Sequence, residues 1–315
     1  MKKILVLGGT GFLGRHVCEQ LNRQGIRATV PTRRMVHARS VQMLPLVDVT
    51  EAHIHDDKQL ARLLPGHDAV INLVAILHGH RKAFQQVHVE LPRRLAHAMQ
   101  TAGVSRLVHV SALGASDNGP SLYQASKAQG EAVLRSASGL ALTILRPSVI
   151  FGADDRFLNL FARLQSVFPV VPLAGAQTRF QPVWVGDVAQ AIVQSLRQPD
   201  TIGKTFECTG PEIYTLADLV RMAGRLTGNP RPVIGLPVAL GYFQALAMEC
   251  MPGEPLMSTD NLRSMEVDNV ASGQAPGLAD LGITAQALEP VAASYLSGSG
   301  LADPLLELRQ QASRR

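Results

Sequence analysis

The chain has 315 residues, of which 46% are hydrophobic and 17% charged, so it is long enough to bury a large core in one large domain or two. Its net charge of +5 suits an anionic partner, but the basic residues are dispersed and aromatic residues make up only 4%, which argues against nucleic-acid binding by base stacking. The three cysteines lie far apart and match no metal-ligand spacing, so we expect a reducing compartment, no disulfide and no metal site.

The first predicted strand, residues 4–7, leads directly into a glycine-rich loop. No apolar signal segment precedes this strand, and we therefore expect a cytoplasmic protein. In the loop, Gly9, Gly11 and Gly14 satisfy the pattern G-x-G-x-x-G, and residues 15–24 continue with helical periodicity. The pattern predicts a dinucleotide whose phosphates lie at the helix N-terminus. The expected contacts are Gly8, Gly9, Thr10, Gly11, Phe12, Leu13 and Gly14.

Arginines follow the second predicted strand, residues 28–32. A fold of this type that binds NAD usually has an acidic residue about 20 positions beyond the glycines, where it holds the ribose 2′-hydroxyl. Residues 20–47 contain no Asp or Glu, whereas Arg33 and Arg34 stand at the strand end. A guanidinium there suits a ribose 2′-phosphate, so NADP(H) is favoured over NAD(H), which remains the alternative. The simpler interpretation of these arginines is a solvated basic face.

Predicted strands and helices alternate through about the first two hundred residues, which is typical of a Rossmann-type α/β fold with a doubly wound parallel sheet. The carboxyl ends of such strands share one edge of the sheet, where we expect the cofactor. Beyond the first two strands, we expect strands at residues 44–47, 69–73, 106–110 and 142–145.

Two short segments at this edge are expected to contact the cofactor. Asp48 and Val49 follow the third strand and are placed to contact adenine, although Asp48 is equally suited to capping the next helix. Leu73, Val74 and Ala75 end the fourth strand, where the chain passes close to the ribose and nicotinamide.

Prolines interrupt the alternating pattern repeatedly after residue 152. We therefore expect two domains. Residues 1–152 and about 180–209 form the nucleotide-binding domain, and about 153–179 with 210–315 form a smaller α/β lobe for a substrate or partner.

Three further residues are candidates for catalysis. Ser111 follows the predicted fifth strand, and Tyr123 and Lys127 are four residues apart, so they share one face of a helix. A phenol beside an ammonium has a stabilised ionised form, so we expect Tyr123 to exchange a proton near neutral pH. Lys127 would also hold the nicotinamide ribose, and Ser111 would orient a substrate oxygen. The alternative is an ordinary surface tyrosine near a surface lysine.

The chain resembles the atypical, extended branch of the short-chain dehydrogenase/reductases, which are similar to NAD-dependent epimerases and dehydratases. Four segments carry this resemblance: the loop 8–14, VSALGA at 110–115, RPSVIFG at 146–152 and RFQPVWV at 179–185. They are most similar to the nucleotide-binding accessory subunit of respiratory complex I and its bacterial relatives. The resemblance implies NADP(H) in a Rossmann lobe, with Ser111, Tyr123 and Lys127 as the catalytic set. It also implies that Pro147 and Val149 border the nicotinamide.

The same resemblance leaves three functions open. The first is hydride transfer on a small carbonyl, alcohol or quinone-related substrate, which is expected to be apolar. The second is a non-catalytic nucleotide-binding subunit or assembly factor of complex I or of ubiquinone biosynthesis. The third is a sugar-nucleotide epimerase or dehydratase. The resemblance also implies a membrane-complex partner, a peripheral position at the inner face of a membrane and a homodimer. We expect the apolar helix predicted at 236–251 to pack into the core, and the alternative is that it forms a docking face or a lipid-tail pocket.

Overall fold

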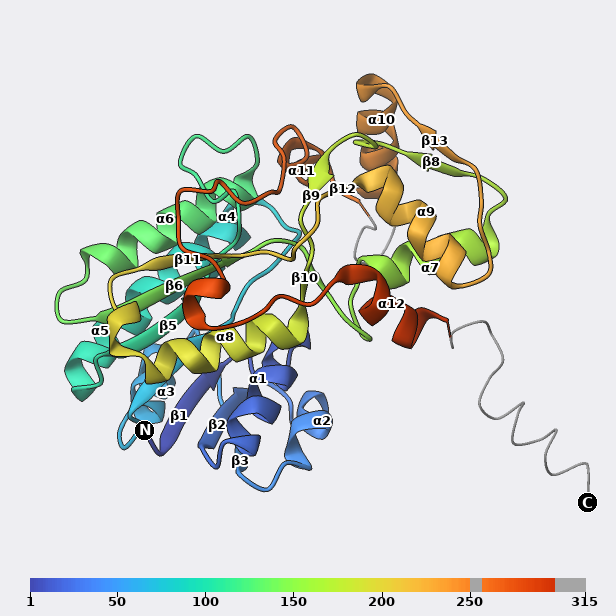
Figure 1. The fold of residues 1–315 in the computed structure, drawn as a ribbon. Coiled ribbons are helices and arrows are strands. Elements are labelled where there is room, and N and C mark those ends of the chain that lie inside the picture. The colour runs from blue at the N-terminus through green and yellow to red at the C-terminus, as the bar shows by residue number, and fades with distance from the viewer. Residues whose placement is uncertain (250–256, 298–315) are drawn as a thin grey trace, which may run out of the picture.

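The computed structural model describes residues 1–249 and 257–297. Its centre is a seven-stranded parallel sheet with the strand order β11-β6-β5-β4-β1-β2-β3 (Figure 1), which confirms the predicted Rossmann-type fold. The chain changes direction across the sheet between β1 and β4, which is the crevice where such sheets bind nucleotides. The strands are β1 (Lys3–Leu7), β2 (Arg27–Thr32), β3 (Val47–Glu51), β4 (Ala69–Asn72), β5 (Arg106–Val110), β6 (Ala141–Pro147) and β11 (Thr205–Cys208).

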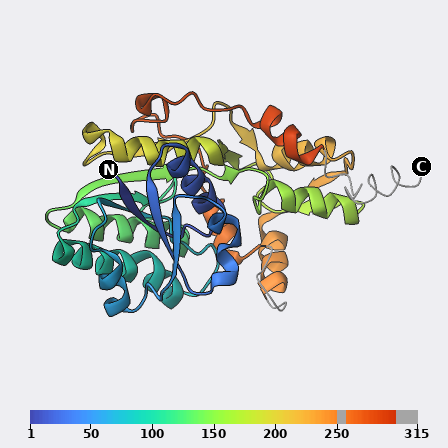
Figure 2. The same ribbon diagram turned by 90° about the horizontal axis from the view of Figure 1, so that it is seen from below.

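Helices cover both faces of this sheet (Figure 2), because its central strands are apolar on both sides. In β1, Ile4 and Val6 point into one core, and Leu5 and Leu7 into the other. One core is covered by α1 (Phe12–Arg23), α2 (Arg39–Gln42) and α8 (Val185–Arg197). The other is covered by α3 (Asp57–Leu63), α5 (Leu91–Ala102) and α6 (Leu122–Ser136).

The third strand begins later than the sequence suggested. The predicted strand 44–47 is instead a turn around Pro45, closed by a hydrogen bond from the Val47 amide to the Leu44 carbonyl (3.1 Å). The apolar residues of this segment imitate a strand, but β3 occupies residues 47–51, and Asp48 pairs with Thr29 near the start of both strands.

A smaller lobe packs beside the carboxyl edge of the sheet and has its own apolar core. Its helices are α7 (Leu158–Val167), α9 (Leu216–Leu226), α10 (Val238–Glu249), α11 (Thr259–Ser264) and α12 (Leu288–Leu296). Its strand pairs are β8 (Val171–Leu173) with β13 (Val233–Gly235), and β9 (Arg179–Phe180) with β12 (Tyr214–Thr215); β7 (Ile150–Phe151) pairs with β10 (Val183–Trp184) where the lobes join.

Part of the C-terminal segment returns to the large sheet. Leu278, Leu281 and Ile283 belong to the core beneath α1 and α8, although the predicted division assigned all of 210–315 to the smaller lobe. The Glu207 amide in β11 donates to the Pro276 carbonyl (2.9 Å), which holds this segment along the edge strand. Within the described residues, no helix is long and apolar enough to cross a membrane.

The contact of α6 with the helix before α5 gives a prediction about stability. A π-helical stretch, η2 (Gln85–Glu90), lies against α6, and a Cβ at Gly130 would come within 2.0 Å of the His88 carbonyl oxygen. Alanine normally stabilises a helix by about 1 kcal/mol relative to glycine. We expect Gly130→Ala to lower the free energy of unfolding instead, by about 1–3 kcal/mol, because the two backbones must separate. Urea denaturation measures this, with Gly277→Ala as control, and an unchanged midpoint would contradict the close packing.

Candidate cofactor and catalytic site

The loop between β1 and α1 is packed too tightly for larger residues. Gly8 has a φ of +82°, in the left-handed region that favours glycine. A Cβ at Gly14 would lie 2.2 Å from the Gly8 carbonyl oxygen, so α1 begins directly against the loop. Thr10 lies in the same turn, and Phe12 and Leu13 begin the helix. Gly11 is the N-cap and no side chain caps α1, which leaves its first-turn amides suited to a phosphate.

The chain that leaves β4 lies beside this loop. A Cβ at Gly8 would be 3.2 Å from the carbonyl carbon of Leu73 and 3.3 Å from the amide nitrogen of Val74. The Val74 amide donates to Asn72 Oδ1 (3.2 Å), which fixes the backbone before Ala75. The structure therefore brings two of the segments predicted to contact the cofactor to the crevice between β1 and β4.

Arg33 and Arg34 follow β2 directly, and both side chains are exposed. The Thr32 hydroxyl donates to the Arg34 carbonyl (3.0 Å) and so shapes the turn that carries them. Within the described residues, no ion pair joins either arginine to a carboxylate. Partial burial, followed by the charges of Arg94 and Arg33, lowers the pKa of His55.

Asp48 and Val49 do not lie where the sequence placed them. Because β3 begins at Val47, Asp48 lies near the amino end of the strand, in an ion pair with Arg27 (3.0 Å). Val49 is partly buried against the core under α1. Both assignments as adenine contacts rested on the wrong strand boundary. The chain leaves the carboxyl end of β3 at residues 52–54, which the sequence analysis did not single out.

Lys127 and Ser111 meet at the carboxyl end of β5. Lys127 Nζ donates to the Val110 carbonyl (2.8 Å), and its side chain is only 2% exposed. Ser111 comes next in the chain, 4% exposed, and its hydroxyl has no hydrogen-bond partner within residues 1–249 and 257–297. Tyr123 lies one turn before Lys127 on α6, half-buried, with its ring edge-on to Phe84 and His88. This is a buried arrangement, so the interpretation as an ordinary surface pair is wrong for Lys127.

Burial changes the protonation of this pair in a direction that the sequence did not suggest. It raises the pKa of Tyr123 to about 12 and lowers that of Lys127 to about 8. We expected the lysine charge to lower the tyrosine pKa towards neutrality. That expectation is wrong for this structure, because desolvation of the phenolate dominates and Lys127 points its ammonium at a backbone carbonyl.

His88 connects the tyrosine helix to the loop after β4, and the sequence analysis missed it. Its Nε2 accepts a hydrogen bond from the Ile76 amide (3.1 Å), so the ring proton is on Nδ1, which bonds to Ser126 Oγ (2.9 Å). Ser126 in turn donates to the Tyr123 carbonyl (2.9 Å). Burial first, and then the charge of Lys127, lowers the pKa of His88 to about 3. The residue is therefore neutral and fixed in one tautomer.

Two residues of the C-terminal segment hold the site from the other side. Asp260 in α11 accepts hydrogen bonds from the amides of Leu122 (2.7 Å) and Tyr123 (3.0 Å), at the N-terminus of α6. Asn269 Oδ1 accepts from the Ser148 hydroxyl (2.6 Å) and the Val149 amide (3.3 Å). These contacts span more than a hundred residues, so no local pattern signals them.

Pro147 ends β6, and its carbonyl accepts a hydrogen bond from the Leu113 amide (2.9 Å). Pro147 and Val149 are thereby placed next to the chain that follows Ser111. Their contact with nicotinamide stays a prediction.

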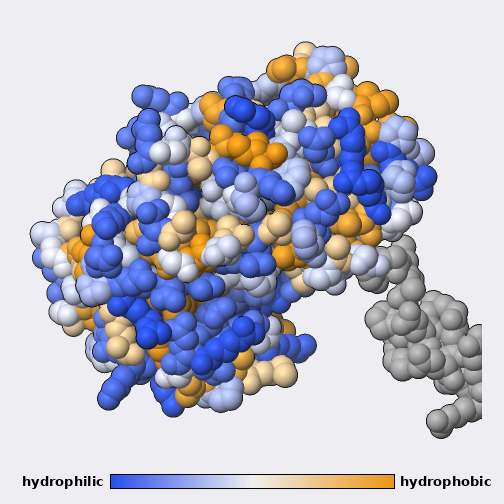
Figure 3. All heavy atoms as spheres, viewed as in Figure 1, coloured by the Kyte–Doolittle hydropathy of each residue, from blue (hydrophilic) through white to orange (hydrophobic). Residues whose placement is uncertain are grey.

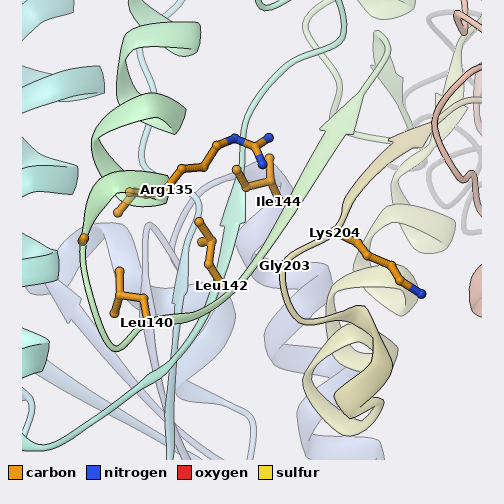
Figure 4. Close-up of a pocket in the computed structure, with 8 residues that line it drawn as sticks. Arg135, Leu140, Leu142, Ile144, Gly203 and Lys204 are labelled. Atoms are coloured by element: carbon orange, nitrogen blue, oxygen red, sulfur yellow. The ribbon is translucent and has the colours of Figure 1, made fainter.

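The residues at the crevice fit a dinucleotide. The glycine loop leaves room for the close approach of a pyrophosphate. The Ser111 hydroxyl, which has no hydrogen-bond partner among the described residues, and the remaining donors of the Lys127 ammonium are polar groups with hydrogen bonds left to make to a ligand. A separate hollow of about 280 Å³ lies against β6 and includes Leu142, Gly203 and Lys204 (Figure 4). None of the predicted site residues lines it.

The sheet order, the glycine loop and this crevice define a Rossmann-type nucleotide-binding protein. The comparison with known families makes this more specific: residues 4–216 match the model of the NAD dependent epimerase/dehydratase family, and the chain belongs to that family. The predicted resemblance is thereby confirmed.

Three similar proteins illustrate its range. Mitochondrial subunit 9 of the NADH dehydrogenase (ubiquinone) 1 alpha subcomplex from Mus musculus is 37% identical over 90% of this chain and 77% of its own length. The ceramide reductase of Caulobacter vibrioides is 31% identical over 74% of this chain and 73% of its own. The structure of Thermus thermophilus UDP-glucose 4-epimerase complexed with NAD covers 94% of this chain and 99% of its own, with a TM-score of 0.69 at 20% identity, which shows a shared fold.

The buried histidine gives a prediction about pH. Because the pKa of His88 falls from 6.5 to about 3 on folding, the unfolded chain binds more protons between these values, and stability falls as the pH drops below 6.5. We expect His88→Asn to be less stable than wild type at pH 7.5, by about 1–3 kcal/mol, but to lose less stability between pH 7.5 and 5. Urea denaturation at both values tests this, with exposed His97→Asn as control. Parallel losses in wild type and His88→Asn would refute it.

Proposed function

We propose that this protein is an NADP(H)-dependent oxidoreductase that transfers hydride between the nicotinamide and a carbonyl or alcohol carbon of a small apolar or quinone-related substrate. The observation that carries the proposal is the buried Ser111 hydroxyl, which has no hydrogen-bond partner among the described residues and directly follows the Val110 carbonyl that the Lys127 ammonium contacts, at the carboxyl edge of the sheet. Such a hydroxyl costs free energy unless a ligand completes its hydrogen bonds. The ceramide reductase, which by its name acts on an apolar substrate, supports the substrate class.

The chemistry assigns a role to each side chain. A bound NADP(H) supplies or accepts the hydride. Ser111 Oγ donates a hydrogen bond to the substrate oxygen and orients it, and Lys127 holds the ribose hydroxyls with the donors that Val110 leaves free. Tyr123 hands its phenolic proton to the substrate oxygen when hydride arrives at the carbon. With a pKa raised to about 12 the phenol is protonated at neutral pH, which favours the direction of carbonyl reduction.

The preference for NADP(H) rests on Arg33 and Arg34. They stand at the carboxyl end of β2, exposed and without a carboxylate partner among the described residues, where a ribose 2′-phosphate would be held by charge-assisted hydrogen bonds. The family model itself is described as NAD dependent, so NAD(H) is the competing cofactor.

A second function follows from the 37% identity to a respiratory-complex subunit. In this alternative the nucleotide holds the two lobes together without turnover, and the protein is a subunit or assembly factor with a membrane-complex partner, located peripherally at a membrane. A homodimer is compatible with either function. A sugar-nucleotide epimerase or dehydratase is the third candidate, and activity on a nucleotide sugar would establish it.

Substitution of Arg33 tests the preference for NADP(H) over NAD(H). We expect Arg33→Ala to weaken NADPH binding about 10- to 100-fold and to leave NADH binding nearly unchanged, because a charge-assisted bond to a phosphate contributes about 1.5–3 kcal/mol. Fluorescence titration of both nucleotides into emptied protein measures this. Arg39→Ala, an exposed arginine on α2, is the matched control. Equal binding of both nucleotides by wild type would remove the basis for NADP(H).

Substitution of Tyr123 distinguishes an oxidoreductase from a non-catalytic nucleotide-binding subunit. We expect Tyr123→Phe to keep NADPH binding within about twofold while lowering NADPH oxidation about 100-fold or more in a screen of quinones and apolar carbonyl compounds, because only the proton donor is lost. The experiment starts from purified protein, and mass spectrometry identifies any nucleotide that this protein releases. Tight retention of the nucleotide, with no turnover by wild type and identical behaviour of the variant, would favour the non-catalytic subunit.

A further inference from the structure

The smaller lobe carries a continuous apolar surface that its own core does not cover. It consists of the end of α7, the edge pair of β8 and β13, and the outer side of α10. Its exposed hydrophobic residues are Val167 (73%), Phe168 (52%), Val170 (37%), Ile234 (54%), Val238 (77%), Leu240 (55%), Phe243 (73%) and Leu246 (55%). We name this set the apolar face.

Contacts between the elements make these residues one surface. Ile234 in β13 is in register with Pro172 in β8, and Gln244 of α10 donates to the Pro172 carbonyl (3.4 Å). Figures 1 and 2 both show α10 projecting from the smaller lobe, and Figure 3 shows hydrophobic atoms gathered over α10. Separate exposed apolar residues are ordinary on a protein surface, whereas a continuous group of this kind marks an interaction site.

The helix α10 is apolar in composition but largely exposed. It contains no charged residue from Val238 to Met248, yet only Gly241 and Ala245 are buried. These two residues are four apart and lie on one narrow strip, where Gly241 packs against Ala174. Tyr242, Gln244 and Met248 are partly buried, whereas Val238, Leu240, Phe243 and Leu246 are exposed on the outer side of the helix, which is unfavourable in water.

The charges around the apolar face indicate what covers it. Residues 156–186 and 219–248, which include the face, contain six arginines and no Asp or Glu. Three of these arginines, Arg179, Arg221 and Arg225, are in ion pairs with carboxylates outside the two stretches. Arg163 lies one turn before Val167 on α7, and Arg231 donates from Nε to the Gln165 carbonyl (3.1 Å), so both stand at the rim of the face. Both are exposed, and no ion pair ties either of them to a carboxylate within the described residues.

Two acidic groups in contact with α10, within the part of the chain that the structure describes, already have hydrogen-bond partners. Glu249 accepts hydrogen bonds from the Thr259 amide and hydroxyl (2.8 and 3.1 Å), and Glu266 accepts one from the Tyr242 hydroxyl (2.9 Å). Among the described residues, the charged side chains at the rim of the apolar face that have no carboxylate partner are thus Arg163 and Arg231. Apolar side chains that insert below the headgroups, with arginines at headgroup level, are the arrangement that binds an anionic lipid surface.

We propose that the apolar face is a docking surface for an anionic lipid bilayer, in which Leu240, Phe243 and their neighbours insert while Arg163 and Arg231 contact the headgroups. This surface is distinct from the nucleotide crevice, so the proposal does not depend on whether the crevice turns over. It places the smaller lobe, and with it α11 and the site that α11 caps, next to the membrane.

The test is co-flotation of the purified full chain with vesicles of phosphatidylcholine alone and of phosphatidylcholine mixed with phosphatidylglycerol. We expect binding to the mixed vesicles, much weaker binding to the neutral ones, and loss of binding at high salt. Phe243→Ser and Leu240→Ser should each weaken binding about tenfold, since each removes an inserted side chain. Arg163→Gln combined with Arg231→Gln should weaken it about tenfold or more.

Matched controls lie on the large lobe. Met43→Ser removes an apolar side chain that is 85% exposed, and Arg39→Gln with Arg62→Gln removes two exposed arginines; neither change should alter flotation. NADPH affinity of every variant should match wild type, because the exchanged side chains lie outside the crevice, and thermal unfolding confirms that each variant is folded at the temperature of the assay. No flotation of wild type with mixed vesicles, equal flotation with neutral vesicles, or unchanged flotation of Phe243→Ser would each overturn the proposal. A dimer in solution that Phe243→Ser dissociates, without vesicle binding, would assign the face to a second copy instead.

Discussion

The arrangement of the site depends on one buried cation. Lys127 holds its ammonium against the Val110 carbonyl, buried at the carboxyl end of β5, and this carbonyl is its one hydrogen-bond acceptor in the part of the chain that the structure describes. A charge in such a place raises the cost of any further positive charge nearby. Burial first, and then this charge, lowers the pKa values of His88 and His109 well below the ordinary one, so both imidazoles are neutral. Neutral imidazoles accept hydrogen bonds, and His88 and His109 use this to fix Ile76 and Asn72 after and within β4.

The backbone around this lysine is determined by close packing. At Gly14 and at Gly130, a backbone carbonyl oxygen lies at a distance that a Cβ would not tolerate. The first approach sets α1 against the loop after β1, and the second sets α6 against the π-helical stretch before α5. Both lobes then close on the same edge through Asp260 and Asn269, so the crevice is bordered by segments from almost the whole chain.

The sequence predicted those parts that local chemistry determines. The glycine spacing, the apolar strands and the four-residue interval from Tyr123 to Lys127 each reflect a single element, and the fold and the family follow from them. The third strand was misplaced because an apolar run around Pro45 imitates a strand, and this error carried Asp48 and Val49 away from the crevice. His88, Asp260 and Asn269 were missed because their partners lie far off in the sequence. The tyrosine pKa was misjudged because desolvation depends on burial, which spacing does not reveal.

The carboxylate of Asp260 affects how the two lobes separate when the protein unfolds. Asp260 lies in the smaller lobe and accepts hydrogen bonds from the amides of Leu122 and Tyr123, in the first turn of α6. A swing of that lobe away from the sheet would strip two hydrogen bonds from the helix start and let that turn fray. Separation of the two lobes and fraying of the turn that carries Tyr123 are thus thermodynamically coupled. The free energy of opening this turn therefore reports on the free energy of separating the lobes.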